Sequence, residues 1–442
     1  MSVFSASSLS LSKQLFNMTW PMLFGILSLM SFQLVDSAFI GQLGVLPLAA
    51  QGFTLPMQMV VIGVQVGLGI ATTSVISRAL GSGNSMYSRQ LAGLVLVIGG
   101  VGIAALCFAV WLFRGYILLF LSAPEEIFIV IESYWPHWLL SAWMGALIYF
   151  YYSICRSNGN TLLPGIMMVI TSLLNLVLDP IFIFTLDLGL NGAAMATTLS
   201  FGLGVLVMGY QVFTKQWLTF NWQGLKISKS LLSLGHIMGP AMISQLFPPI
   251  ASMIATKLIA SFGAAAVAAW ALGSRFEFFS IVVVLALTMS MPPMVGRLYG
   301  AKKIGEIKQL VAIACCFILG FQLLIAIATF FASTWLAGLM TSEPYVSNIL
   351  RWHLVLIPIS LGALGICMLM VSVLNALGRP YVALLVSALR LFAFFVPGLW
   401  LGAEVAGLKG LFAGVLIANV VAGGCAWSVY LREVKLIEQA SS

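Results

Sequence analysis

Residues 162–184 read LLPGIMMVITSLLNLVLDPIFIF, and this stretch decides the class of fold. It contains no Lys, Arg or Glu and a single Asp, Asp179. A helix of about 20 apolar residues, rising ~1.5 Å per residue, crosses the hydrocarbon core of a bilayer. We therefore predict that this stretch is a transmembrane helix that carries one carboxyl group inside the membrane.

The composition extends this prediction to the whole chain. Of its 442 residues, 61% are hydrophobic and only 7% are charged. A soluble domain has about 25% charged residues, so these residues cannot form a surface that faces water. The composition excludes soluble enzymes and nucleic-acid-binding proteins, and it identifies the lipid bilayer as the solvent of the chain.

Breaks in the apolar pattern divide the chain into twelve predicted membrane spans, which makes the expected fold an all-α polytopic membrane protein. The longest hydrophilic break separates an N-terminal lobe (1–213) from a C-terminal lobe (233–442), with a linker at 214–232. The spans of the two lobes are 15–39, 48–76, 91–113, 129–153, 162–184 and 190–213, followed by 234–260, 265–294, 309–332, 348–374, 381–403 and 407–431.

The positive charges predict how the chain is oriented. Of 20 Lys and Arg residues, fourteen lie at the chain ends or after even-numbered spans, whereas three lie in the opposite loops. Cytoplasmic loops are rich in Lys and Arg, so both termini are predicted to be cytoplasmic in a bacterial inner membrane. The net charge of +8 then reflects orientation, and we expect no nucleic-acid partner.

The two lobes are related by an internal duplication. An offset of 219 residues aligns Pro21 with Pro240, Gly44 with Gly263 and Arg78 with Arg297, among other matches. Six spans per copy is an even number, so both copies enter the membrane from the same side. We expect a pseudo-two-fold axis along the membrane normal, as in transporters that bind substrate between two parallel repeats.

Two acidic residues of the first lobe are predicted to share one depth in the membrane. Asp36 lies about four residues from the outer end of its span, and Asp179 about five. Asn175 shares a helix face with Asp179, while Thr197 and Tyr134 reach a similar level. Intramembrane acids usually act on ions or protons, and oxygen ligands of these kinds suit H⁺ or a hard cation such as Na⁺.

The second lobe carries a different set of polar residues. Lys257, Arg275, Glu277 and Arg390 fall within its predicted spans. Arg275 and Glu277 are two residues apart and cannot share a helix face, so each is expected to pair with another span. The set is predicted to be either a structural ion pair or a polar spot that contacts substrate. The histidines, His353 among them, are expected near the membrane interfaces.

Taken together, these residues resemble the multidrug and toxic compound extrusion (MATE) family over nearly the whole chain. The matching segments are Trp20-Pro21, Leu34 to Gly41, Leu48 to Ala50, Arg78 to Gly83, Asn175 to Pro180 and Gly189 to Thr197. The resemblance implies a V-shaped pair of lobes and a cation-coupled antiporter that expels cationic, amphipathic drugs. It also implies that Asp36, Asn175, Asp179, Thr197 and Tyr134 form the cation or proton site.

The resemblance differs between branches of the family. The NorM-like branch carries acids in its seventh and tenth spans, where this chain has Lys257 and no acid. The chain is thus closer to the DinF-like branch, which favours H⁺ as the coupling ion over Na⁺. We expect a monomeric proton-coupled multidrug efflux antiporter with no cofactor, no metal apart from the Na⁺ alternative, and no enzymatic activity. A lipid or lipid-linked oligosaccharide flippase of related architecture is the alternative.

Overall fold

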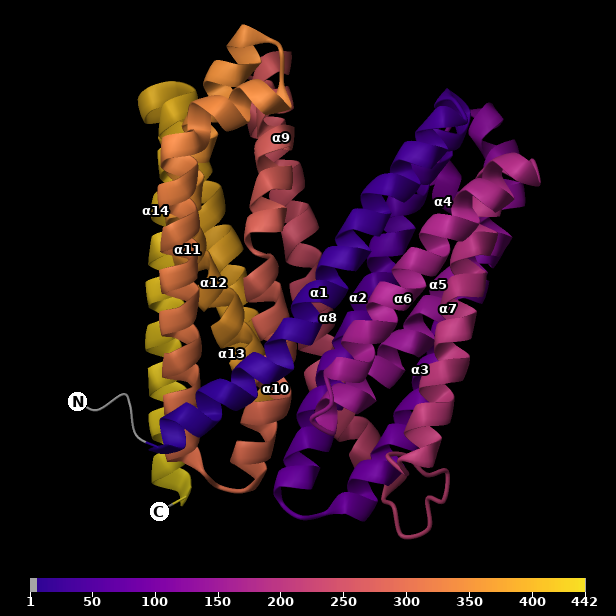
Figure 1. The fold of residues 1–442 in the computed structure, drawn as a ribbon, viewed down its shortest axis with the longest axis vertical. Coiled ribbons are helices and arrows are strands. Elements are labelled where there is room, and N and C mark those ends of the chain that lie inside the picture. The colour runs from indigo at the N-terminus through magenta and orange to yellow at the C-terminus, as the bar shows by residue number, and fades with distance from the viewer. Residues whose placement is uncertain (1–5, 442) are drawn as a thin grey trace. The chain divides into compact units, whose positions relative to one another are not determined.

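The computed structural model describes residues 6–441, and every regular element within them is helical (Figure 1). The first and last residues, whose cytoplasmic location the sequence predicts, lie outside this part. Contacts divide the chain into two compact units, one formed by Asn17–Met242 and the other by Ile243–Ser442 with the N-terminal residues up to Phe16. The division falls within one helix, so the linker at 214–232 stays a prediction.

The first half of the chain contributes seven α-helices and one π-helical segment. They are α1 (Ala6–Gln42), α2 (Val45–Gly81), α3 (Ser85–Leu112), α4 (Arg114–Phe120), α5 (Glu125–Ser157), α6 (Leu162–Pro180), η1 (Ile181–Thr185) and α7 (Gly189–Thr214). Figure 1 shows α5 and α7 side by side, and the contacts of α5 with α2, α3 and α7 build the centre of this unit.

The second half repeats the pattern with different interruptions. Its elements are α8 (Ile227–Ala260), α9 (Ala264–Ser280), α10 (Val282–Gly300), α11 (Ile304–Met340), α12 (Pro344–Ala376), α13 (Pro380–Ala388), η2 (Leu389–Phe395) and α14 (Val396–Ser441). Non-helical backbone angles at Ala406 and Gly407 divide α14 into two helices. With α9 and α10 counted as one interrupted crossing, the described helices provide the twelve predicted spans.

The backbone repeats at the interval that the sequence predicts. The bounds of α5 and α12 differ by 219 residues at both ends, and α2 corresponds in the same way to α9 and α10 together. Gly44 and Gly263 both adopt positive φ, at 107° and 99°, in the turn before these helices. Glycine tolerates this conformation because it has no Cβ. The duplication is therefore present in the turns as well as in the helices.

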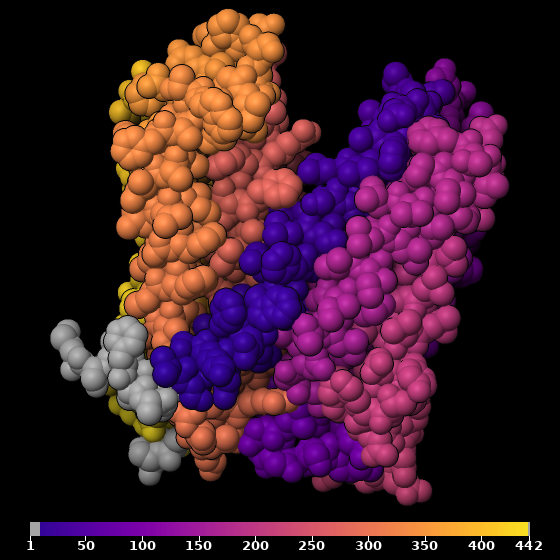
Figure 2. Space-filling model, in the orientation of Figure 1, coloured from indigo at the N-terminus to yellow at the C-terminus, as the bar shows by residue number. Residues whose placement is uncertain are grey.

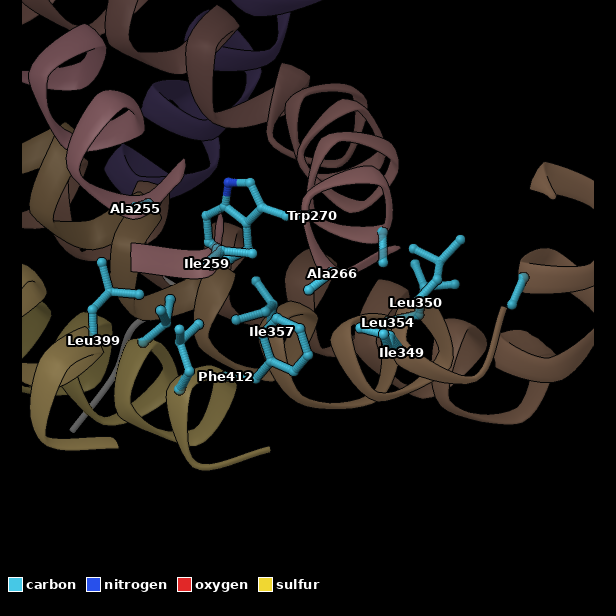
Figure 3. Close-up of a cluster of buried hydrophobic side chains, with 14 of the residues drawn as sticks. Ala255, Ile259, Ala266, Trp270, Ile349, Leu350, Leu354, Ile357, Leu399 and Phe412 are labelled. Carbon is cyan, nitrogen blue, oxygen red and sulfur yellow. The ribbon is translucent and has the colours of Figure 1, made fainter. Parts of the chain in front are cut away.

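The core of the second unit is a cluster of aliphatic side chains around Trp270 and Phe412 (Figure 3). These two rings stack with centroids 6.3 Å apart and an interplanar angle of 1°. Trp270 comes from α9, and Phe412 comes from α14, so the cluster joins helices that are distant in the sequence. The cluster holds these helices together on one side of the second-lobe polar residues.

Four glycines bring the two halves of α14 into close contact. Gly398 and Gly402 precede the break, and Gly410 and Gly414 follow it. A Cβ at Gly414 would overlap the carbonyl oxygen of Gly398, and one at Gly402 would overlap that of Gly410. Small residues at four-residue spacing allow membrane helices to approach this closely.

We expect Gly414→Val to force these helices apart and to lower the free energy of unfolding by about 1–3 kcal/mol, the usual cost of overpacking. Thermal unfolding of the purified protein in detergent measures the loss. Gly424→Val, on the same helix at a position where an added Cβ meets nothing within 4 Å, is the control. Equal melting temperatures for the two variants would contradict the assigned contact.

Candidate functional site

The helix α6 has its polar side inside the unit and its apolar side outside. Its exposed residues are all aliphatic and follow a helical spacing: Leu162, Ile166, Ile170, Leu173 and Val177, continued by Ile181 in η1. Its buried face carries Thr171, Ser172, Asn175 and Asp179. This is the reverse of a soluble amphipathic helix, and it is the arrangement required where hydrocarbon is the outer solvent. Part of this surface is visible in magenta in Figure 2.

Asp179 is the most enclosed of the predicted site residues, with none of its surface exposed. Both ends of the Asn175 amide have hydrogen-bond partners in one orientation of the side chain. In that orientation, its nitrogen donates to Asp179 Oδ2 at 2.7 Å. In this orientation its oxygen accepts a hydrogen bond from the Thr197 backbone N–H at 3.0 Å. The Thr197 hydroxyl in turn donates to the carbonyl oxygen of Ala193 at 3.0 Å. A chain of polar contacts thus links α7 to the buried carboxyl group.

Asp36 of α1 completes the carboxyl pair. Its side chain lies within hydrogen-bonding reach of Asp179. Each Asp precedes the end of its continuous helix by six residues, at Gln42 for α1 and Thr185 for η1, which places both about 9 Å from a helix end. Tyr134 of α5 is buried and close enough to Asp36 to interact with its charge. The five predicted residues therefore lie in one region of one unit.

The backbone changes form directly after Asp179. Pro180 lacks an N–H donor, and the next five residues, Ile181–Thr185, form the π-helical segment η1. Segments of π-helix often occur at functional sites because they change which side chains a helix presents. The backbone of this span thus changes form directly after its buried polar residues.

The pair is suited to hold a proton between two carboxyl groups. Among the described residues, neither Asp36 nor Asp179 forms an ion pair within 4.0 Å, and Oδ1 of Asp36 is buried without a hydrogen-bond donor. Two ionised carboxylates in contact repel each other strongly where water is excluded. A single proton turns the contact into an O–H···O hydrogen bond. The geometry therefore favours one shared proton in the state that the structure describes.

The second-lobe residues are arranged differently. Glu277 of α9 lies with its Oε1 2.7 Å from Nε2 of His353 on α12, and the Glu277 side chain is 22% exposed. Arg390 of η2 is near enough to interact with the charge of Glu277. Arg275 and Lys257 are exposed, and Lys257 is in the last turn of α8. Of the four predicted residues, the structure brings together only Glu277 and Arg390.

The location of His353 near a membrane interface stays a prediction, and the structure shows that its side chain is enclosed by the second unit. Its side chain is 0% exposed and lies edge-on to Trp270 and Phe412, with centroids 5.3 and 5.2 Å away. Its nearness to the start of a span suggested the interface, but tertiary packing encloses it. The duplication contains a signal for the buried position of His353, because this residue is 219 residues after Tyr134 and so corresponds to it in the second copy. The two copies therefore place a polar ring at equivalent positions, and each ring lies near an acid, although Asp36 and Glu277 do not themselves correspond.

We expect Asn175→Leu to destabilise the first unit more at pH 8 than at pH 5. The lost hydrogen bond matters most when Asp179 is ionised, and a buried charge without a donor costs about 1–3 kcal/mol or more. Thermal unfolding at the two pH values measures the difference. Asn419→Leu, which removes a buried amide that donates to Ser360 at 3.0 Å, should destabilise equally at both. A pH-independent effect of Asn175→Leu would contradict the assigned contact.

Comparisons with known proteins identify the family of this chain. The MatE family model matches the chain twice, at residues 21–181 and 240–401. A FAD transporter of Shewanella oneidensis is 31% identical over 94% of this chain and 93% of its own, and the multidrug export protein MepA of Staphylococcus aureus is 25% identical over 92% and 90%. The crystal structure of the Vibrio cholerae MATE transporter VcmN in the bent form superposes with a TM-score of 0.96 at 65% identity, covering 98% of both chains. The chain belongs to the MATE family of transporters.

Proposed function

We propose that this protein is a proton-coupled multidrug efflux antiporter of the inner membrane, closer to the DinF-like than to the NorM-like branch. The observation that carries the proposal is the contact between the Asp36 and Asp179 carboxyl groups, without an ion pair for either among the described residues. Intramembrane acids of this kind are typical of proton relays. Multidrug export by the MepA relative supports small, cationic, amphipathic substrates.

The proposed mechanism uses the charge of the pair. Protons from the outside neutralise Asp36 and Asp179, which removes the charge that α1 and α6 hold between them. The packing of α1 then changes, and the drug is displaced outward. Loss of the protons toward the cytoplasm restores the charge and resets the transporter. Alternating access of this type requires that protons bind with different affinity to the outward-facing and the inward-facing state. Protonation and deprotonation of the Asp36–Asp179 pair provide this difference in the proposed mechanism.

The choice of H⁺ over Na⁺ rests on the Asn175 amide. Its oxygen accepts from the Thr197 backbone N–H, and its nitrogen faces Asp179. A Na⁺ site would need oxygen ligands converging on one point, and this amide presents a donor there instead. The proposed orientation places both termini in the cytoplasm because Lys and Arg are concentrated in those segments and loops. The proposed working unit is a monomer.

A second substrate class is an organic anion with an aromatic ring system. The FAD transporter relative, at 31% identity, is the reason to consider it. Arg390 favours it independently, because a positive charge inside the second unit suits an anionic substrate better than a cationic drug. Transport of both classes by one protein is compatible with two lobes that carry opposite intramembrane charges.

We expect Asp36→Asn to abolish drug-driven proton movement in proteoliposomes, down to the level of protein-free liposomes, because the amide cannot release a proton. Pyranine fluorescence inside the vesicles reports the movement, with pH and sodium gradients imposed separately. Glu132→Gln is the matched control, since this acid forms an exposed ion pair with Arg114 at 3.0 Å. Retained proton movement in Asp36→Asn, or drug flux driven by sodium at constant pH, would contradict the proposal.

A further inference from the structure

A small cavity lies beside Arg390 in the second unit. It has a volume of about 50 Å³, and its wall includes Ser244 and Phe247 of α8 and Ser387, Arg390 and Phe395 of α13 and η2. Since one water needs about 10–15 Å³ in this measure, the cavity has room for a group of a few heavy atoms but not for a ring system. Its wall thus combines one guanidinium, two hydroxyls and aromatic rings.

Arg390 lies at the depth where transporters bind their substrates. It is ten residues from the start of α13 at Pro380, or about 15 Å along the helix, which is half the thickness of a ~30 Å hydrocarbon core. Many secondary transporters hold their substrates near the midplane. A charged residue at this depth is expensive unless it faces a cavity or a partner.

The charge of Arg390 is not neutralised by direct contact with an acid. Within residues 6–441, its guanidinium has no carboxylate oxygen within 4.0 Å, and Glu277, the acid whose charge reaches it, is in contact with His353 instead. Guanidinium binds carboxylate and phosphate oxygens in a planar, two-point geometry. The cavity therefore offers a positive charge and room for the oxygens of an anionic group.

The aromatic residues around the cavity indicate what the anionic group is attached to. Phe247 and Phe395 form part of the wall, and Phe392 meets Phe247 edge-on at 5.7 Å. Arg390 is carried by the π-helical segment η2, a form of backbone that is common at binding sites. Aromatic rings favour edge and stacked contacts with another ring system over contact with flexible lipid chains.

We propose that Arg390 binds the carboxylate or phosphate group of an aromatic substrate in this cavity, beside Ser244 and Ser387, while the ring system of the substrate stays outside the cavity against Phe392, which is exposed and meets Phe247 edge-on. This inference rests on the proposed transport function, and it assigns the anionic substrate class to a site in the second unit. The site is separate from the Asp36–Asp179 pair, which belongs to the other unit. Binding can therefore be tested without transport.

The experiment compares two probes that differ only by a phosphate. Binding of riboflavin 5′-phosphate and of riboflavin to the purified full-length protein in detergent is followed by quenching of flavin fluorescence. We expect the phosphate to improve binding about tenfold or more, the gain typical of a charge-assisted hydrogen bond. Equal affinity for the two probes would overturn the proposal.

Variants locate the effect at the cavity. Arg390→Gln should bind riboflavin 5′-phosphate and riboflavin with equal affinity. Arg275→Gln, at an exposed position of the same unit, should still bind riboflavin 5′-phosphate more tightly. Ser387→Leu fills the cavity and leaves the Arg390 guanidinium in place, and it should also remove the preference for riboflavin 5′-phosphate. This variant tests the proposal if Arg390→Gln does not fold. A preference retained in either cavity variant that folds would overturn the proposal.

Two further measurements separate this inference from other outcomes. Asp36→Asn should keep the preference, so that a failure of proton coupling and a failure of the anion site give different results. Phosphatidylglycerol should displace riboflavin 5′-phosphate no better than phosphatidylcholine does. Selective displacement by phosphatidylglycerol would assign the cavity to a lipid headgroup and would overturn the proposal.

Discussion

The structure of the first unit depends on the cost of placing the Asp179 carboxyl group inside the membrane. This side chain is 0% exposed, on a helix whose outer face is entirely aliphatic. An ionised carboxylate there is stable only with hydrogen-bond donors or with a proton. Asn175 supplies a donor from the same helix, and Asp36 supplies the partner for a shared proton. The contacts among α1, α6 and α7 follow from this requirement.

The duplication gives each unit a polar ring at the same position, Tyr134 or His353, and each ring lies near an acid that has no acidic counterpart in the other unit. The chemistry of the two pairs differs. In the first unit, Asp36 lies near Tyr134 and a second acid, so the site has excess negative charge that protons can neutralise. In the second unit, Glu277 is near both His353 and Arg390, so its charge is balanced by basic groups. This difference agrees with the roles proposed for the two units, proton coupling in the first and anion binding in the second.

Much of the fold could be predicted because the bilayer restricts it so strongly. The length of an apolar run determines a span, and the 219-residue offset determines the repeat, down to the turns at Gly44 and Gly263. The depth of Asp36 and Asp179 followed from their distance to the span ends. The enclosure of His353 could not be predicted, because a sequence gives distance along a helix but not which neighbouring helix covers a residue. The π-helical form of η2 around Arg390 does have a signal in Pro397, which lies two residues after η2 and removes a hydrogen bond to the preceding turn.

The orientation of one amide connects the local structure to the choice of ion. If the Asn175 oxygen turned toward Asp179 to join a cation site, its NH₂ group would donate to the Thr197 hydroxyl at 3.0 Å, but Asp179 would lose its donor and the Thr197 backbone N–H would lose the amide oxygen as an acceptor. The loss of a buried hydrogen bond of this kind costs about 1–3 kcal/mol, and a cation would have to supply that energy each time it bound. A proton has no such cost, because it sits between the carboxyl groups and leaves the amide in place. Under the proposed proton coupling, Asn175 therefore keeps one orientation, in which its nitrogen faces Asp179 and its oxygen faces the backbone of α7.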